Sequence, residues 1–267
     1  MVLLRVEDIS RVYPLGGRGV AALRGISFEV SRGEFVSIMG PSGSGKSTLL
    51  NILGCLDRPT EGSYFIEDRD VSVLGSSQLA DLRGGVIGFV FQTFNLIPTL
   101  TARENVEVPL LYRGVGASER RRLAMQVLDE VGIADRSDHL PSELSGGEQQ
   151  RTAVARALVT NPVLILADEP TGNLDSKASK SIMGLFQRIN EEHGVTIIQV
   201  THDSRMALYG TRMIRFTDGK IVGDHSVTER LRADDPRASE DDEDGEGINT
   251  LVSDGERRVT ECFNEQS

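Results

Sequence analysis

Long apolar runs are missing from this chain of 267 residues. The longest, "VLILA" and "VTIIQV", contain five and six residues, whereas a helix that crosses a bilayer needs about 20. The first residues, "MVLLRVEDIS", carry acidic side chains directly after a brief apolar start and offer no small-residue cleavage site, so they do not resemble a secretory signal. We therefore expect a cytoplasmic protein that has no membrane-spanning helix.

Cysteine is also scarce. The two cysteines, Cys55 and Cys262, lie far apart and lack the C-x-x-C spacing of zinc and redox sites. This spacing indicates neither a metal site built from cysteine nor a disulfide framework.

Acidic residues are in excess mainly at the C-terminal end. Twelve acidic residues and three arginines from residue 233 onward give this segment a net charge of −9, so the preceding 232 residues carry only −2 of the total of −11. A block such as "SEDDEDGEG" contains too few apolar residues to offset the entropy lost on ordering. We predict a folded domain over residues 1–232 and a disordered acidic tail over 233–267. The nearly neutral domain disfavours nucleic acid as a partner.

Short strand-like runs alternate with helix-period runs, which favours an α/β fold. The runs at 35–39, 163–167 and 196–200 are almost continuously apolar, as is typical of strands buried on both faces of a parallel sheet. "LLRVEDI" and "ISFEV" near the N-terminus alternate instead, which predicts a half-exposed antiparallel sheet. A helix is expected over 118–131, with Ser118 as its N-cap and Gly132 as its stop.

The segment "GPSGSGKST" follows the first buried strand and precedes the helix-period run "LLNILG". It fits G-x-x-x-x-G-K-[ST], a phosphate-binding P-loop in which backbone N–H groups and a helix N-terminus surround phosphate oxygens. We expect Lys46 to bridge the β- and γ-phosphates and the hydroxyl of Ser47 to hold Mg²⁺. The candidate binding residues are Gly40, Pro41, Ser42, Gly43, Ser44, Gly45, Lys46, Ser47 and Thr48.

Two buried strands end in residues suited to hydrolysis. "LILADE" places Asp168 where a P-loop enzyme holds Mg²⁺, and Glu169 where a carboxylate could polarise an attacking water. "DEP" is also turn chemistry, but the P-loop upstream favours the catalytic interpretation. "TIIQVTHD" ends in His202, which could bond the γ-phosphate or the water, although an isolated histidine in such a place is more often structural.

"LSGGEQQR", residues 144–151, predicts a helix start in which Ser145 and Glu148 form a capping box. Gly146 and Gly147 lie in the first turn and each cost about 1 kcal/mol relative to alanine. Without side chains there, the backbone N–H groups are open to a close approach by an anion.

These motifs, with Gln92 after "IGFVF" and "GNLD" at 172–175, occur in the order and rough spacing of ABC-transporter ATPase subunits, and residues 3–225 resemble that family. The resemblance implies a P-loop NTPase fold with a mainly parallel core sheet, an N-terminal antiparallel β subdomain and an inserted helical subdomain at about 93–160. "FQTFNLIPTLTARENVEVPL" and "PTGNLD" are most similar to the lipoprotein-releasing, macrolide-exporting and cell-division subgroup.

The family resemblance also implies roles for further residues. Tyr13 would stack on adenine, Gln92 would sense Mg²⁺ and the attacking water, and Asp175 would communicate between two ATP sites. Each ATP would lie between one subunit's P-loop and Ser145, Gly146 and Gly147 of a second copy, which makes the working form a homodimer. The implied catalytic residues are Glu169, His202, Lys46 and Gln92, and the implied metal ligands are Ser47, Gln92 and Asp168.

The expected function is hydrolysis of ATP to ADP and phosphate at the cytoplasmic face of the membrane. Through a separate permease it would drive export, lipoprotein release or transmission of force across the membrane. Phe94, Asn95, Leu96 and Ile97 would contact that permease or would instead belong to the core of the helical subdomain. An alternative is a soluble ABC ATPase acting on nucleic acid or the ribosome, but the coiled-coil, zinc or second ATPase segments of such proteins are not apparent between Lys46 and Asp168.

Overall fold

The computed structural model describes residues 1–15 and 18–235, which form two compact units. Unit 1 comprises residues 1–74 and the described chain from residue 200 onward, and unit 2 comprises residues 75–199. The boundary falls within strand β8 (Thr196–Thr201). The predicted acidic tail lies outside the described residues from 236 onward.

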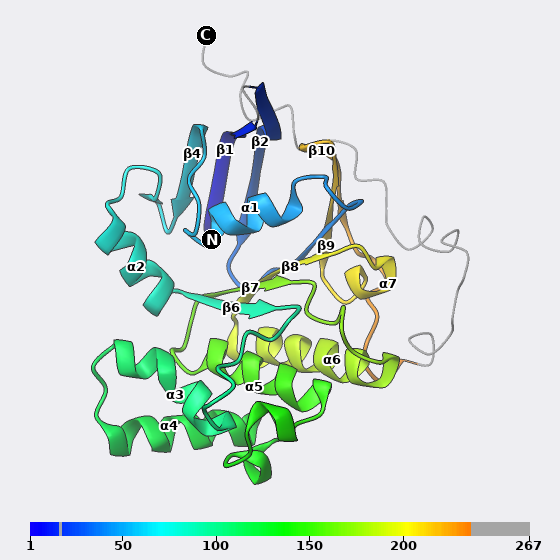
Figure 1. The fold of residues 1–267 in the computed structure, drawn as a ribbon. Coiled ribbons are helices and arrows are strands. Elements are labelled where there is room, and N and C mark those ends of the chain that lie inside the picture. Colours follow the sequence, from blue (N-terminus) through cyan, green and yellow to red (C-terminus); the bar gives the residue numbers. More distant parts are fainter. Residues whose placement is uncertain (16–17, 236–267) are drawn as a thin grey trace. The chain divides into compact units, whose positions relative to one another are not determined.

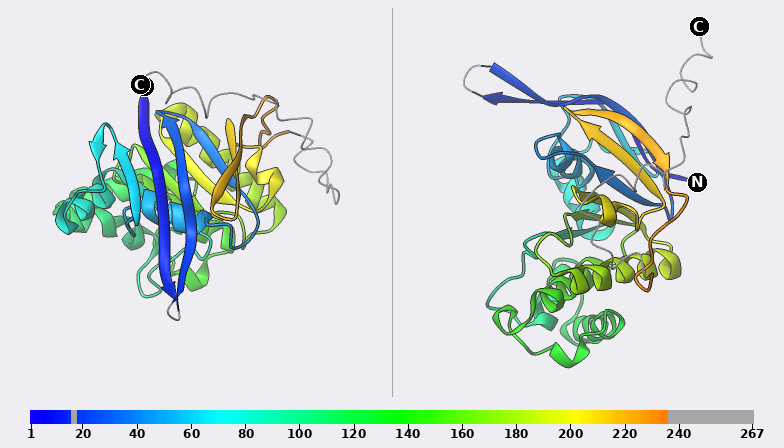
Figure 2. Two further views of the ribbon diagram at one scale, coloured as in Figure 1. Left: turned by 90° about the horizontal axis from the view of Figure 1, so that it is seen from above. Right: turned by 90° about the vertical axis from the view of Figure 1, so that its right-hand side faces the viewer.

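Unit 1 contains the predicted antiparallel sheet. Its strand order is β2-β1-β4-β5, formed by β1 (Val2–Leu15), β2 (Arg18–Ser31), β4 (Glu61–Ile66) and β5 (Arg69–Asp70). Figure 2 shows β1 and β2 running alongside each other as two long strands. Leu4, Val6 and Ile9 of β1 are buried. The alternation read from the sequence therefore corresponds to one buried face of this sheet.

The P-loop of unit 1 is preceded by a buried and mostly apolar strand. In β3 (Phe35–Met39) the side chains of Phe35, Val36 and Ile38 are all buried. β3 pairs in parallel with β9 (Arg212–Thr217), which in turn pairs antiparallel with β10 (Lys220–Ser226). The helices of this unit are α1 (Lys46–Leu53) and α7 (Ser204–Ala207).

Unit 2 combines a parallel strand pair with helices. β6 (Ile87–Phe91) pairs in parallel with β7 (Leu164–Asp168), which confirms the parallel arrangement expected for such apolar strands. The sequence between β6 and β7 contains α3, α4 and α5, which are drawn in green in Figure 1. Of these helices, α3 packs against both α4 and α5. The helices are α2 (Ser76–Gly85), α3 (Ala102–Tyr112), α4 (Ala117–Glu130), α5 (Gly146–Leu158) and α6 (Ser176–His193), with short 3₁₀ turns at Ala134–Arg136 and Pro141–Glu143.

The start of α4 differs from the prediction. Gly116, in extended conformation, is the N-cap in place of Ser118, which lies inside the first turn. The guanidinium of Arg120 donates to the carbonyl of Val115 at 2.7 Å and lies 3.6 Å from the carboxylate of Glu107 on α3. These tertiary contacts favour a start two residues earlier than the local capping preference. The end of the helix is as predicted, because Gly132 directly follows its last turn with φ +77°.

Within the described ranges, no helix combines the length and the apolar character that a membrane crossing requires.

Candidate functional site

The P-loop of unit 1 lies between two backbone segments that leave no room for side chains. A Cβ on Gly40 would lie 2.3 Å from the carbonyl oxygen of Phe216, and one on Gly45 would lie 2.4 Å from that of Ala22. Gly45 also has φ +103°, which favours glycine. The carbonyl of Ser44 accepts a hydrogen bond from the N–H of Gly219 at 2.9 Å. The loop is thus held between β2 and the β9–β10 turn.

Two polar side chains of the P-loop face inward. Lys46 is 6% exposed, and its Nζ donates to the carbonyl oxygens of Gly40 and Pro41, each at 2.8 Å. The hydroxyl of Ser44 is buried without a hydrogen-bond partner in the described chain. Leaving such a group unsatisfied costs about 1–3 kcal/mol. A loop with a buried ammonium, an unsatisfied hydroxyl and a helix N-terminus fits the phosphates of a nucleotide.

Tyr13, the residue expected to contact the base, lies on β1 of the same unit. It pairs with Val20 on β2, two residues or about 7 Å along the strand from Ala22, which lies against the P-loop. The hydroxyl of Tyr13 donates to Oδ2 of Asp57 at 2.7 Å. The guanidinium of Arg11 lies 4.5 Å from the centre of the tyrosine ring and donates to Oδ1 of Asp57 at 2.8 Å.

His202, also in unit 1, directly follows the last residue of β8 and is exposed. The next residue, Asp203, caps α7 by accepting hydrogen bonds from the N–H groups of Arg205 at 2.8 Å and Met206 at 3.2 Å. The histidine therefore occupies the end of a buried strand, as its sequence context predicts.

In unit 2 the strand β7 ends at Asp168, and the chain turns sharply at the next residue. Glu169 has φ +44°, a left-handed conformation that costs a residue with a side chain about 1–3 kcal/mol, and it precedes Pro170. The N–H of Gly172 donates to the carbonyl of Glu169 at 3.0 Å. Such strain is often found at functional sites, and here it falls on the carboxylate that the sequence marks as the base.

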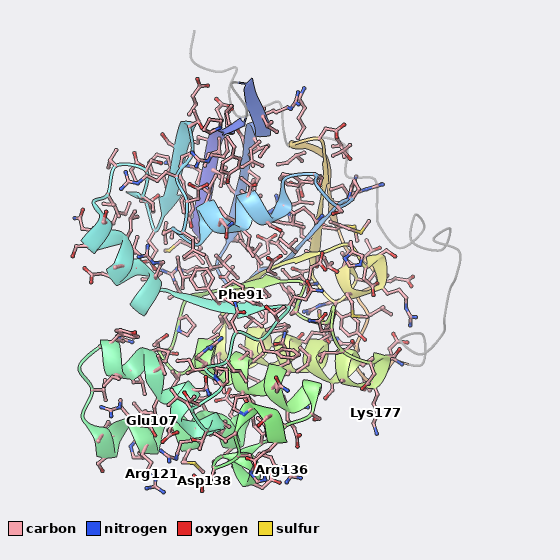
Figure 3. The ribbon with its side chains drawn as sticks, in the orientation of Figure 1. Phe91, Glu107, Arg121, Arg136, Asp138 and Lys177 are labelled. Carbon is pink, nitrogen blue, oxygen red and sulfur yellow. The ribbon has the colours of Figure 1, made fainter. Side chains whose placement is uncertain are left out.

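A buried glutamine supports this turn. Gln150 of α5 is fully buried, and its Nε2 donates to the carbonyl oxygens of Pro170 and, at 3.5 Å, of Phe91. Figure 3 labels Phe91, the last residue of β6, which directly precedes Gln92. Gln150 thus links the segments that carry Gln92 and Glu169. The sequence assigns Gln150 no role, because nothing in "LSGGEQQR" shows which glutamine faces inward.

Gln92 contacts the segment that follows Glu169. Its Nε2 donates to Oδ1 of Asn173 at 3.3 Å, and Nδ2 of Asn173 donates back to the carbonyl of Gln92 at 3.1 Å. A Cβ on Gly172 would lie 2.7 Å from Nε2 of Gln92. Asp175, two residues after Asn173, caps α6 by accepting the N–H of Ala178 at 2.8 Å. Unit 2 therefore brings Gln92 into contact with the "GNLD" segment.

The start of α5 has the predicted capping box. Oε2 of Glu148 accepts both the N–H and the hydroxyl of Ser145, each at 2.8 Å, and the N–H of Glu148 donates to the Ser145 hydroxyl at 3.4 Å. Nε of Arg136, labelled in Figure 3, lies 3.2 Å from the other carboxylate oxygen. The N–H of Ser145, then its hydroxyl, then the charge of Arg136 lower the pKa of Glu148.

The glycine after the cap packs against the same segments. A Cβ on Gly146 would lie 3.3 Å from Cδ2 of Leu174 and 3.9 Å from Cζ of Phe94. Phe94 and Asn95 are both left-handed, and Arg156 donates to their carbonyl oxygens at 2.8 and 2.5 Å. Of the segment expected to contact a permease or the core, Asn95 and Ile97 are exposed, whereas Phe94 and Leu96 are half-buried.

The site residues thus form two groups. The P-loop, Tyr13 and His202 belong to unit 1, whereas unit 2 holds the acidic, amide and signature-helix residues Gln92, Ser145, Gly146, Gly147, Asp168, Glu169 and Asp175.

Comparison with known sequences shows which family this chain belongs to. The profile described as ABC transporter matches residues 23–172. An uncharacterized ABC transporter ATP-binding protein of Thermotoga maritima is 55% identical over 221 residues, which cover 83% of this chain and 94% of that protein. The macrolide export ATP-binding/permease protein MacB of Syntrophobacter fumaroxidans is 54% identical over 223 residues, 83% of this chain but only 31% of MacB.

A solved structure agrees. The ATP-binding cassette MJ0796 of Methanocaldococcus jannaschii, in a dimeric post-hydrolysis state bound to ADP and phosphate, superposes with a TM-score of 0.78 and 46% identity over 84% of this chain and 98% of that one. This likeness confirms the predicted fold class, a P-loop ATPase cassette with an antiparallel β subdomain and a parallel sheet. By its sequence, its fold and its motifs, the chain belongs to the ABC transporter family, among the family's ATP-binding proteins.

Proposed function

We propose that this chain is the ATP-hydrolysing subunit of an ABC transporter complex whose membrane-spanning part is a separate permease. The observation that carries the proposal is the P-loop, where the buried hydroxyl of Ser44 has no partner among the described residues and the positions of Gly40 and Gly45 leave no room for a Cβ. Lys46 donates to the carbonyl oxygens of this loop at Gly40 and Pro41. Membership of the ABC transporter family supports the same activity.

Nucleotide binding in this proposal uses unit 1. The backbone N–H groups of residues 42–48 surround the phosphates, and Lys46 exchanges its two carbonyl partners for the β- and γ-phosphate oxygens. The hydroxyl of Ser44 gains the partner that it lacks in the loop itself. Tyr13 offers its ring to the adenine.

Hydrolysis in this proposal uses the residues that the sequence marks as catalytic. Glu169 accepts a proton from the attacking water, Gln92 orients that water, and His202 donates a hydrogen bond to the γ-phosphate. Ser47, Asp168 and Gln92 would hold Mg²⁺, which neutralises charge on the phosphates when bound. Lys46 stabilises the charge that develops on the transferred group.

A second copy of the chain completes each site in this proposal. Ser145 caps the start of α5, and Gly146 and Gly147 place backbone N–H groups in the first turn of that helix, an arrangement that binds anions. The P-loop of the same chain already supplies one such anion site. The dimeric form of MJ0796 supports the interpretation that the second one serves the ATP of a partner subunit. A two-fold arrangement makes the two sites equivalent.

The transport role rests on likeness to MacB, whose name describes an ATP-binding part and a permease part together. The match covers about a third of MacB. In this proposal the permease is another polypeptide that spans the membrane, and this chain binds it at the cytoplasmic face. Export, lipoprotein release and transmission of force across the membrane are the three processes that this subgroup offers. The exposed residues Asn95 and Ile97 are the contact that we assign to the permease.

The variant Glu169→Gln tests the proposed hydrolysis of ATP separately from the proposed binding of ATP. Because the amide cannot accept the proton, ATP hydrolysis should fall at least about 100-fold, while the Kd for ATP stays near that of the unchanged protein. The control Glu130→Gln removes a carboxylate that pairs with His193 away from the site and should keep full turnover. Normal turnover by Glu169→Gln would remove Glu169 from its role.

The same variant, which retains ATP, is then a bait for partners. Isolated from membranes in mild detergent with ATP, it should carry a permease polypeptide identified by mass spectrometry. Recovery of nucleic acid or ribosomes instead would overturn the transporter assignment.

A further inference from the structure

Tyr13 is held by a pair of charged residues that the nucleotide-binding motifs do not include. Arg11 and Asp57 form an ion pair at 2.8 Å, and their side chains are only 23% and 24% exposed. Asp57 accepts the Tyr13 hydroxyl with one oxygen and Arg11 with the other. Both members of the ion pair therefore contact Tyr13, Asp57 through its hydroxyl and Arg11 through its ring face.

This arrangement leaves one face of the ring for stacking. The guanidinium of Arg11 lies 4.5 Å from the ring centre, so a base can stack only on the opposite face. The hydrogen bond of the Tyr13 hydroxyl to Asp57 fixes the direction of the side chain. Because the hydroxyl lies on the axis about which the ring turns, the plane of the ring is limited instead by the guanidinium of Arg11 on one face, which Asp57 holds in place.

Asp57 is itself fixed to the helix that follows the P-loop. Its N–H donates to the carbonyl of Asn51 in α1 at 3.1 Å, and the N–H of Leu56 donates to the same oxygen at 2.8 Å. A few residues later the chain returns to β1, where the hydroxyl of Thr60 accepts the N–H of Val12 at 3.0 Å. The carboxylate of Asp57 is therefore positioned by the same short helix that begins at Lys46.

We propose that Asp57, with Arg11, is a positioning residue that orients Tyr13 for the nucleotide base and so sets the affinity for the base while leaving phosphate binding unchanged. The proposal rests on the base contact assigned to Tyr13 above. Holding the ring in its stacking orientation removes the cost of ordering it during binding. Loss of Asp57 returns that cost to every binding event.

The test compares two ligands that differ in the base. Mg-ADP carries the adenine and Mg-pyrophosphate does not, and neither has the γ-phosphate that would close a dimer. With the full-length chain, Asp57→Ala should raise the Kd for ADP about three- to tenfold, by the cost of ordering one side chain, and leave the Kd for pyrophosphate unchanged. Asp57→Asn, which keeps one acceptor oxygen, should restore part of the ADP affinity.

Two further variants separate positioning from a general structural effect. Tyr13→Phe keeps the ring but removes the hydroxyl, and should weaken ADP binding in the same direction without disturbing the fold. In a Tyr13→Ala background, Asp57→Ala should cause no further loss. The control Glu7→Ala breaks a similar pair on β1, in which Arg5 lies 4.4 Å from the ring centre of Phe65 and 2.9 Å from Glu7, and should leave both Kd values unchanged.

Each contrary result has its own meaning. Equal loss of ADP and pyrophosphate binding in Asp57→Ala, or a further loss in the Tyr13→Ala background, would show that Asp57 supports the P-loop rather than Tyr13 and would overturn the proposal. Unchanged ADP binding by Asp57→Ala and Tyr13→Phe would also overturn it. Unchanged ADP binding by Tyr13→Ala alone would overturn the base contact of the proposed function and this inference with it.

Discussion

Glu148 joins three groups at the start of α5. Its carboxylate accepts two hydrogen bonds from Ser145 and faces the guanidinium of Arg136. Each of these contacts favours the charged form, so the pKa of Glu148 is lowered from the ordinary value of 4.5. A carboxylate with a lowered pKa stabilises the fold fully above the unfolded value, and this contribution is lost as the pH falls through the folded value.

We therefore expect Glu148→Ala to lower the free energy of unfolding at neutral pH by about 0.5–2 kcal/mol, the usual cost of losing a helix cap. The deficit should be constant above pH 4.5 and should shrink as the pH falls below it. Urea unfolding across this range measures both. Glu148→Gln, which keeps an acceptor oxygen for the N–H of Ser145, should lose less. A deficit that is the same at neutral and acidic pH would show that ionisation of Glu148 does not contribute.

The P-loop is an element whose shape depends on the segments behind it. Gly40 and Gly45 lie against carbonyl oxygens of β9 and β2, whereas Gly43 has no heavy atom within 4 Å of its would-be Cβ. Gly43 and Gly45 both have positive φ, at +79° and +103°. The two glycines thus share a positive φ, which would strain a residue with a side chain, but they differ in the space around them.

This difference predicts unequal effects of alanine. Gly43→Ala should lower the free energy of unfolding by about 1 kcal/mol, which is the conformational cost of a side chain at positive φ. Gly45→Ala places a Cβ 2.4 Å from the carbonyl oxygen of Ala22, so the loop must move. The affinity for ADP should therefore fall well below the affinity of Gly43→Ala. Calorimetric titration with ADP, beside thermal unfolding of each variant, measures the two effects. Equal losses would mean that β2 does not constrain the loop.

Strand β3 and helix α4 show which element boundaries can be predicted from local sequence patterns. Strand β3 matches its predicted bounds, because four apolar residues and Ser37 lie between Glu34 and Gly40, which leaves little freedom. Helix α4 stops at Glu130, just before the predicted stop residue Gly132. Its N-cap lies two residues before the predicted one, because Arg120 bonds to Val115 and lies close to Glu107. The stop of α4 depends on a single glycine, whereas its start depends in part on a contact with the neighbouring helix α3.

At the scale of the whole molecule, the proposed dimer depends on the first turn of α5. A Cβ on Gly146 would meet Leu174 at 3.3 Å and nothing else closer than 3.9 Å, so the fold can accommodate a side chain with a small shift. A negative charge in the first turn is also favourable for the helix itself. A carboxylate here should therefore harm the approach of a phosphate more than it harms folding.

Gly146→Asp should consequently abolish ATP-dependent dimerisation while the monomer binds ADP with unchanged Kd. Static light scattering with ATP, in the Glu169→Gln background that retains the nucleotide, measures the dimer. Gly146→Asn is the matched control, because it adds the same bulk without charge and should keep more of the dimer, most visibly at low salt. If Gly146→Asp dimerised as fully as the Glu169→Gln protein without it, the assignment of α5 to a second nucleotide site would be wrong.

Sequence alone determined the family and the fold class, because the P-loop pattern has glycines, a lysine and a hydroxyl at fixed spacing along one loop. It also determined the capping box of α5, since that contact spans only three residues. Only the tertiary structure decided which residues support these motifs. Gln150 reaches Pro170 across 20 residues and Asp57 reaches Tyr13 across 44. Such contacts arise from chain folding over long separations, and no local period or spacing encodes them.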